Sequence, residues 1–166
     1  PNGVFNVVNG YGPTVGAALS EHPNVAMMSF TGSTRAGIAV AQASASSVKR
    51  VHQELGGKSP NIILDDVADL EKSVKGGAGH CFLNSGQSCN APTKMLISSK
   101  NYDKAVEIAV ATANSTTVGD PNGEFRLGPI ANKVQYEKIL KLIEIGIEEG
   151  ATLVAGGVEK PDGCNK

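Results

Sequence analysis

The sequence contains no tryptophan, and aromatic residues make up only 4% of it. It has no apolar run long enough to cross a bilayer, which argues against a membrane protein. Its 15 basic residues are balanced by 16 acidic ones and form no basic run that could neutralise a row of phosphates. The sequence therefore argues against nucleic acid as a partner.

Cysteine is also scarce, with three residues at irregular spacing: Cys81, Cys89 and Cys164. Their number is odd, and none of them forms the Cys-x-x-Cys pair that zinc sites and redox motifs use. We expect no metal site and no disulfide framework. This cysteine usage is typical of a reducing compartment and predicts a cytoplasmic location.

The residues that are present indicate a globular fold. With 166 residues, 40% of them hydrophobic, the chain can bury about 70% of its unfolded surface. Its 20 glycines are typical of a fold with many tight turns. Short β-branched runs alternate with segments of helical period, which predicts an α/β fold with a largely parallel sheet and helices against its faces. The expected strands are residues 4–8, 24–30, 48–55, 61–64, 94–98 and 152–155. The expected helices are residues 13–22, 33–46, a segment from Asp69, 102–115 and 133–149.

A Gly-Gly and a Pro in LGGKSP interrupt this pattern between two expected strands. Such an interruption is typical of a domain crossing, so we place a boundary near Gly56. Residues 1–56 and 57–166 are then two domains. The chain opens on Pro1 within an apolar run and ends in PDGCNK after a strand-like segment. We therefore expect it to be part of a longer protein.

The first motif that could carry chemistry combines NGYGPTVG with SFTGSTRAG, and it contains Gly12, Gly32 and Ser33. In the second stretch, an expected strand runs into Gly32, and Ser33 can cap the helix that follows. Free backbone N–H groups at such a helix start suit a phosphate. The glycine spacing differs from Gly-x-Gly-x-x-Gly, and the same residues also fit a plain helix cap.

The second motif is QELGGKSP, in which Glu54 ends an expected strand where the chain turns on two glycines. A carboxylate at a strand end that faces a crevice can act as a general base. The alternative is a solvated glutamate, because most glutamates are exposed.

The third motif is NSGQSC, where small polar residues lead into Cys89. Small residues let a substrate approach the sulfur closely, and an activated thiolate is a strong nucleophile. A lone cysteine in a turn can equally be structural. Cys81 lies in an apolar helical pattern and Cys164 near the end of the chain, so we assign neither any chemistry.

Taken together, SFTGST, ELGGKSPNIIL and NSGQSC resemble, in order and spacing, the NAD(P)-dependent aldehyde dehydrogenase superfamily. The likeness extends over nearly the whole chain. It implies a Rossmann-like half of the cofactor domain in residues 1–56 and half of the catalytic domain in residues 57–166. It also implies a small aldehyde as substrate, NAD or NADP as cofactor and a homo-oligomeric full-length enzyme.

The resemblance assigns roles to individual residues. Cys89 matches the thiol that adds to the aldehyde carbonyl, and its backbone N–H would help to hold the oxyanion. Glu54 matches the base that activates the water for hydrolysis of the resulting thioester. The cofactor candidates are Gly32 and Ser33 at the pyrophosphate, Gly12 near the adenine and Leu55 near the nicotinamide.

The chain also departs from the family. Lys94 stands where many relatives have Arg, which puts any bidentate contact there in doubt. The family's Pro-Trp-Asn and Glu-Glu-x-Phe-Gly-Pro motifs are missing, so we expect residues 1–166 alone to be inactive.

Two other functions stay open at this stage. The chain could be a non-catalytic remnant or nucleotide-binding module of the same fold. It could also be a Cys-His hydrolase that pairs Cys89 with His80 or His52, although His80 lies nine residues earlier on an expected helix. We interpret His52 as an exposed strand residue and not as a base.

Overall fold

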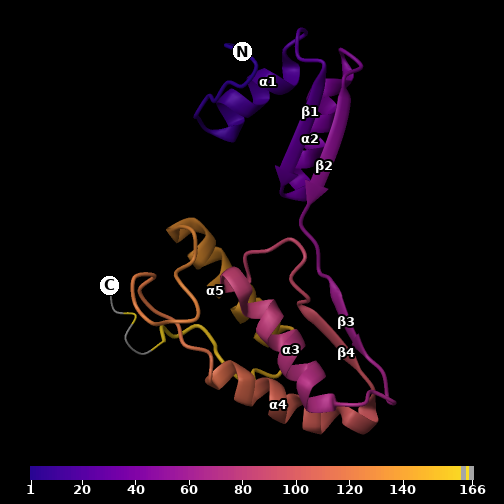
Figure 1. Cartoon of the computed structure of the whole chain (residues 1–166), viewed down its shortest axis with the longest axis vertical. Coiled ribbons are helices and arrows are strands. Elements are labelled where there is room, and N and C mark those ends of the chain that lie inside the picture. The colour runs from indigo at the N-terminus through magenta and orange to yellow at the C-terminus, as the bar shows by residue number, and fades with distance from the viewer. Residues whose placement is uncertain (162–163, 165–166) are drawn as a thin grey trace. The chain divides into compact units, whose positions relative to one another are not determined.

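The computed structural model describes residues 1–161 and residue 164. The chain divides into two compact units, Pro1–Gly56 and Gly57–Lys166. Each unit holds a two-stranded parallel sheet whose strands are joined through a helix (Figure 1). Within the described residues, no helix is both long and apolar enough to cross a membrane.

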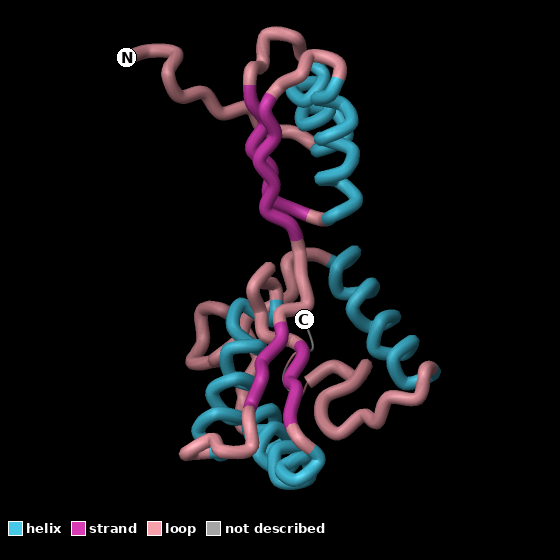
Figure 2. The backbone as a smooth tube through the Cα atoms, turned by 90° about the vertical axis from the view of Figure 1, so that its right-hand side faces the viewer, coloured by secondary structure: helices cyan, strands magenta, loops and turns pink. Residues whose placement is uncertain are grey.

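The first unit is a β–α–β arrangement preceded by a short helix. Figure 2 shows its helices on one side of its two strands. Its elements, in chain order, are a π-helical turn Gly12–Gly16, α1 Ala17–Glu21, β1 Met27–Gly32, α2 Thr34–Ala45 and β2 Arg50–Leu55.

Alternating burial along β2 explains why these residues form a half-covered strand. Val51, Gln53 and Leu55 are partly buried, whereas the residues between them are exposed. The Gln53 side chain donates to the carbonyl of Gly37 in α2. A Cβ on Gly37 would lie 2.7 Å from Cδ2 of Leu55, so a larger residue there would have to displace the Leu55 side chain.

The second unit repeats the arrangement and adds two helices. Its elements, in chain order, are β3 Pro60–Ile63, α3 Leu70–Phe82, a 3₁₀ turn Leu83–Gly86, β4 Lys94–Ile97, a 3₁₀ turn Ser99–Asn101, α4 Tyr102–Asn114 and α5 Lys133–Glu148. Side-chain caps start two of the helices: Asp69 accepts a hydrogen bond from the backbone N–H of Lys72, and Asn132 accepts one from that of Gln135.

The core of the second unit lies where α3 and α4 meet the sheet. Val74 is fully buried, and Ile63 and Ala105 are 6% and 3% exposed. Partly buried apolar side chains surround these three, namely Val67, Leu70, Met95, Ile97, Ile108 and Ala109. The i, i+4 spacing of Leu70, Val74 and Ala78 therefore does mark the inner face of α3.

Two predicted strands are wrong. Residues 4–8 and 152–155 form no strand in the structure, although both runs are apolar. Val4 and Phe5 are 75% and 85% exposed, and Leu153 and Val154 are about half exposed. A strand exists only where its backbone groups pair with a neighbour, and no described segment pairs with either run. An apolar pattern alone could not reveal that.

The predicted fold class is confirmed, and the other predicted elements are present with shifted ends. The run at 24–30 yields β1 at residues 27–32, and the run at 48–55 yields β2 at residues 50–55. The start of β2 is displaced because Val48 has a positive φ of 52°, which a strand does not permit.

Val74→Ala should destabilise the protein by about 2–3 kcal/mol, because it leaves a cavity in the fully buried core of the second unit. Urea unfolding followed by circular dichroism measures this loss. Val134→Ala is the matched control, since Val134 on α5 is 71% exposed and its truncation should change stability by less than about 0.5 kcal/mol. Equal losses in the two variants would contradict the assignment of the core.

Candidate functional site

The functional candidates of the first unit lie at one edge of its sheet. Parallel pairing of β1 with β2 sets Gly32 opposite Leu55 and Thr31 opposite Glu54. Because the strands run in the same direction, their carboxyl ends meet at this edge, as Figure 1 shows. In open α/β sheets, ligands bind outside the carboxyl ends of the strands.

Ser33 begins α2 directly after β1. Its backbone is extended, and its hydroxyl accepts a hydrogen bond from the N–H of Ala36 at 3.3 Å. The first N–H groups of α2 have no partner within the helix, so they leave a partial positive charge at this edge. The arrangement fits an anion such as a pyrophosphate.

Gly32 keeps the end of β1 free of a side chain. A Cβ at this position would lie 2.6 Å from Cζ of Phe30, so the Phe30 ring occupies that space. Any larger residue would have to displace the ring. By the pairing of β1 with β2, Gly32, Ser33, Glu54 and Leu55 share one edge of the sheet.

Gly12 lies elsewhere in the first unit. It opens the π-helical turn before α1, and a Cβ placed on it would meet no atom within 4 Å. Open space there is compatible with a ligand. The neighbour against which this turn mainly packs is α1.

Glu54 projects from the uncovered face of β2. Its side chain is 65% exposed, and the Nε2 atom of His52 lies 3.7 Å from its Oε1 atom. His52 is 57% exposed and two residues earlier on the same strand, so both side chains share one face. The prediction of an exposed His52 is confirmed.

Cys89 lies on an exposed loop that connects α3 to β4, called here the thiol loop (residues 83–93). Asn84, Ser85 and Gly86 have positive φ values of 53°, 55° and 73° in succession. Two non-glycine residues in this region cost conformational energy and persist only where the surroundings hold them. The turn is therefore fixed by other contacts.

Those contacts come from residues 128–131. The Ser85 hydroxyl donates to the carbonyl of Gly128 at 2.8 Å. The Gln87 amide oxygen accepts from the backbone N–H of Ala131 at 2.8 Å, and its nitrogen donates to the carbonyl of Asn84 at 3.0 Å. Gln87 thus ties the thiol loop both to itself and to a segment more than 40 residues later.

From the sequence, Ser85 and Gln87 are only small polar neighbours of the thiol, and their bonds to residues 128–131 were not predicted. The signal available was the chemistry of Gln87, since an amide can donate and accept at the same time. Its partners could not be found from the sequence because they are backbone groups far along the chain.

The other side of the thiol loop faces the start of β3. The backbone N–H of Lys94 donates to the carbonyl of Ser59 at 3.3 Å, at the point where the pairing of β4 with β3 begins. A Cβ on Gly57 would lie 3.5 Å from the carbonyl oxygen of Cys89. Gly57 therefore lies beside the Cys89 carbonyl of the thiol loop.

The remaining cysteines are held differently from Cys89. Cys81 is partly buried in the last turn of α3, and this burial raises the pKa of its thiol. The Cys164 thiol donates to the carbonyl of Val118 at 3.5 Å. His80 lies exposed on α3, and in the described part of the chain no hydrogen bond or ion pair joins it to Cys89.

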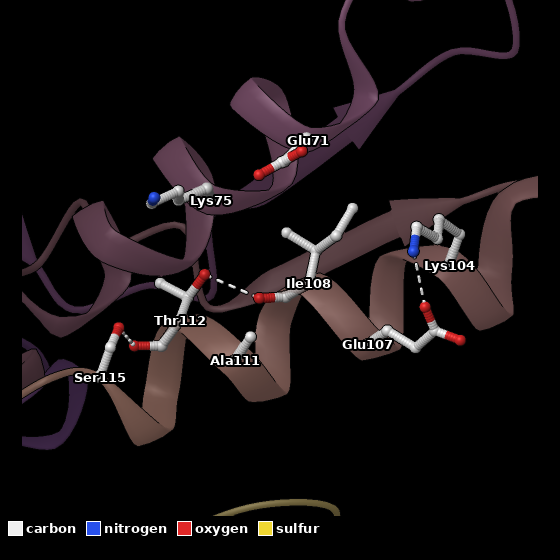
Figure 3. Close-up of a pocket in the computed structure, with 8 residues that line it drawn as sticks. All are labelled: Glu71, Lys75, Lys104, Glu107, Ile108, Ala111, Thr112 and Ser115. Carbon is white, nitrogen blue, oxygen red and sulfur yellow. Dashed lines mark hydrogen bonds and ion pairs between the residues drawn. The ribbon is translucent and has the colours of Figure 1, made fainter.

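A groove between α3 and α4 contains none of the predicted site residues (Figure 3). Lys104 donates to Glu107 at 2.8 Å, which raises the pKa of Lys104. Thr112 donates to the carbonyl of Ile108 at 2.7 Å. These polar groups are satisfied within α4, as in an ordinary packing groove. Among the described residues, no group of three or more His, Cys, Asp or Glu side chains could hold a metal ion.

Comparisons with known proteins agree with the motifs. The model of the aldehyde dehydrogenase family matches residues 1–166. A 3-succinoylsemialdehyde-pyridine dehydrogenase from Pseudomonas sp is 53% identical over 164 residues, which are 98% of this chain and 34% of that protein.

Solved structures give the same answer. An aldehyde dehydrogenase from Bartonella henselae is 50% identical with a TM-score of 0.93, and the match covers 98% of this chain and 34% of that one. A mutant of aldehyde dehydrogenase C from Pseudomonas syringae, in complex with NAD⁺ and octanal, is 49% identical with a TM-score of 0.92. That match covers 96% of this chain and 33% of the other. The chain thus spans about a third of the length of these relatives.

At near-neutral pH, iodoacetamide should modify Cys89 about ten-fold faster than Cys81. Cys89 is exposed, whereas Cys81 is partly buried and its raised pKa leaves less thiolate to react. Peptide mass spectrometry at timed intervals measures both rates. Cys89→Ser should remove the fast phase and leave the slow one unchanged. Equal rates at the two cysteines would contradict the assigned exposure.

Gln87→Ala should speed hydrogen exchange at the Ala131 amide by a few-fold to about ten-fold, because the variant removes an acceptor whose hydrogen bond contributes about 0.5–1.5 kcal/mol. Exchange of residues 127–133 followed by mass spectrometry measures this change. Gln135→Ala is the control, since the Gln135 side chain lies on exposed α5 and takes part in no described hydrogen bond. Unchanged exchange at Ala131 would show that Gln87 does not hold the two segments together.

Proposed function

Because the chain belongs to the aldehyde dehydrogenase family, we propose that it carries the nucleophile and the hydrolytic base of an enzyme that oxidises an aldehyde to a carboxylic acid with NAD(P). The nucleophile is Cys89 and the base is Glu54. The observation that carries the proposal is an exposed thiol on a loop held in a strained conformation against Gly57.

The covalent chain supports a joint role for Glu54 and Cys89. Gly57, which contacts the thiol loop, is three residues after Glu54. A fully extended chain spans at most about 3.6 Å per residue, so the Cα atoms of Glu54 and Gly57 are within about 11 Å of each other in any arrangement. Beyond this limit, the pairing of the two side chains rests on family membership.

In the proposed mechanism, the Cys89 thiolate attacks the aldehyde carbonyl and forms a thiohemiacetal. The new C–S bond places negative charge on the carbonyl oxygen, and the backbone N–H of Cys89 donates a hydrogen bond to it. The strained turn at Asn84 and Ser85, with the contacts of Gln87, keeps the sulfur accessible while the substrate binds.

Glu54 acts in the second half of the reaction. Loss of hydride converts the thiohemiacetal into a thioester on Cys89. The Glu54 carboxylate then removes a proton from a water molecule, which attacks the thioester carbonyl and releases the carboxylic acid. The exposed position of Glu54 at a strand end leaves its carboxylate open to that water.

NAD(P) would supply the acceptor for the hydride when bound. Its pyrophosphate would fit the start of α2, where Ser33 caps the helix directly after Gly32. Leu55 lies at the same edge and would approach the nicotinamide end, and the open surface at Gly12 would take the adenine. The complex of aldehyde dehydrogenase C with NAD⁺ and octanal supports a cofactor and substrate of these classes.

Several properties of the full-length protein belong to the same proposal. We assign residues 1–56 to the cofactor-binding domain and residues 57–166 to the catalytic domain, and we expect a homo-oligomer in the cytoplasm. Residues 1–166 should have no turnover alone, because the chain spans only about a third of its relatives.

In the full-length protein, Cys89→Ala should abolish turnover, since it removes the atom that bonds to the substrate. Glu54→Gln should keep a burst of reduced nicotinamide and lower the steady-state rate by at least about 100-fold, because thioester hydrolysis loses its base. Stopped-flow absorbance at the reduced-nicotinamide band measures both phases. Full steady-state activity in Cys89→Ala would refute the proposed function.

A further inference from the structure

The proposed mechanism requires one proton to leave Glu54 in every turnover. Each turnover adds a proton to the Glu54 carboxylate, and this proton must leave before the next water can be activated. Proton transfer needs an acceptor within hydrogen-bond reach or across one bridging water.

His52 is the one titratable side chain that the described structure pairs with Glu54. Its Nε2 atom lies 3.7 Å from the Glu54 Oε1 atom, a separation that a small side-chain rotation brings within hydrogen-bond distance. The alternation of β2 places both side chains on the uncovered face, so they are neighbours on one side of the strand.

Imidazole suits this task because it gains and loses a proton near neutral pH. At 57% exposed, His52 also has direct access to solvent. The other charged group on this face is Arg50, two residues before His52, and the neighbouring strand presents the uncharged Ser29 opposite His52 and Thr31 opposite Glu54. In the first unit, no described carboxylate other than that of Glu54 forms an ion pair with the imidazole.

We propose that His52 accepts the proton that Glu54 takes from the hydrolytic water and passes it to solvent. The inference rests on the proposed function of Glu54. The O–H bond of the protonated Glu54 carboxyl breaks and an N–H bond forms at Nε2, which gives an imidazolium. A proton then leaves the imidazolium for bulk water, so that both residues return to their starting states. His52 acts through Glu54 and does not touch the substrate.

The test measures thioester hydrolysis directly in the full-length protein. Quenched-flow mixing with aldehyde and NAD(P)⁺ gives the decay of the acyl-enzyme, separately from the burst that reports its formation. His52→Ala should slow this decay at least about ten-fold and leave the burst rate unchanged. Added imidazole should restore most of the lost rate, because it supplies the missing proton acceptor.

His22→Ala is the matched control. It removes an imidazole from the same unit but from the end of α1, and it should neither slow hydrolysis nor respond to added imidazole. An acyl-enzyme decay rate in His52→Ala that lies within about two-fold of the wild-type rate would overturn the inference. The inference would also be overturned if added imidazole did not restore the decay rate, or if the substitution slowed the burst as much as the decay.

The inference can fail without the proposed function. If Cys89→Ala is inactive and Glu54→Gln stalls after the burst while His52→Ala behaves as wild type, only the role of His52 is wrong. If no burst appears in the unaltered protein, the proposed function itself is wrong.

Discussion

Parallel pairing of β3 with β4 is the constraint on which the position of the thiol depends. Two parallel strands cannot be joined by a tight turn, so the chain must return to the starting end of the sheet before the second strand begins. Here α3 makes that return, and the thiol loop follows it. The loop therefore ends beside the start of β3, where Lys94 bonds to Ser59 and the Cys89 carbonyl lies against Gly57.

In the first unit, the candidate site residues lie at the carboxyl ends of the strands, whereas the thiol loop of the second unit lies at the amino ends of its strands. There the carboxyl ends of β1 and β2 bring Gly32, Ser33, Glu54 and Leu55 together. The chain then leaves β2 and, within a few residues, enters β3. Glu54 and Gly57 are thus close in the sequence, and within the second unit the thiol loop lies beside Gly57 because β4 pairs with β3.

Helix starts, strand runs and reactive residue types could be predicted from the sequence because they depend on local chemistry. Ser33 and Asp69 cap helices as expected, and the period of α3 marks its buried face. The strands expected at 4–8 and 152–155 could not be judged locally, since strand formation needs a partner. An apolar run reveals burial tendency but not which segment pairs with it.

The candidate site divides in the same way. Cys89 and Glu54 stood out by residue type and motif, and both side chains are exposed. The bonds of Gln87 and Ser85 to Ala131 and Gly128 could not be predicted, because backbone groups carry no sequence signal. His52 was interpreted as an exposed strand residue; the predicted strand already placed it on the same face as Glu54, but the distance between the two side chains depends on their rotamers, which the sequence does not give.

The account is tested most directly by locating the covalent intermediate. The Glu54→Gln variant of the full-length protein, mixed with NAD(P)⁺ and an aldehyde that the unaltered protein oxidises and then quenched in acid, should carry the mass of the corresponding acyl group on the peptide that contains Cys89. Peptide mass spectrometry would identify that position. An unmodified Cys89, or an acyl group on Cys81 or another residue, would contradict the central claim.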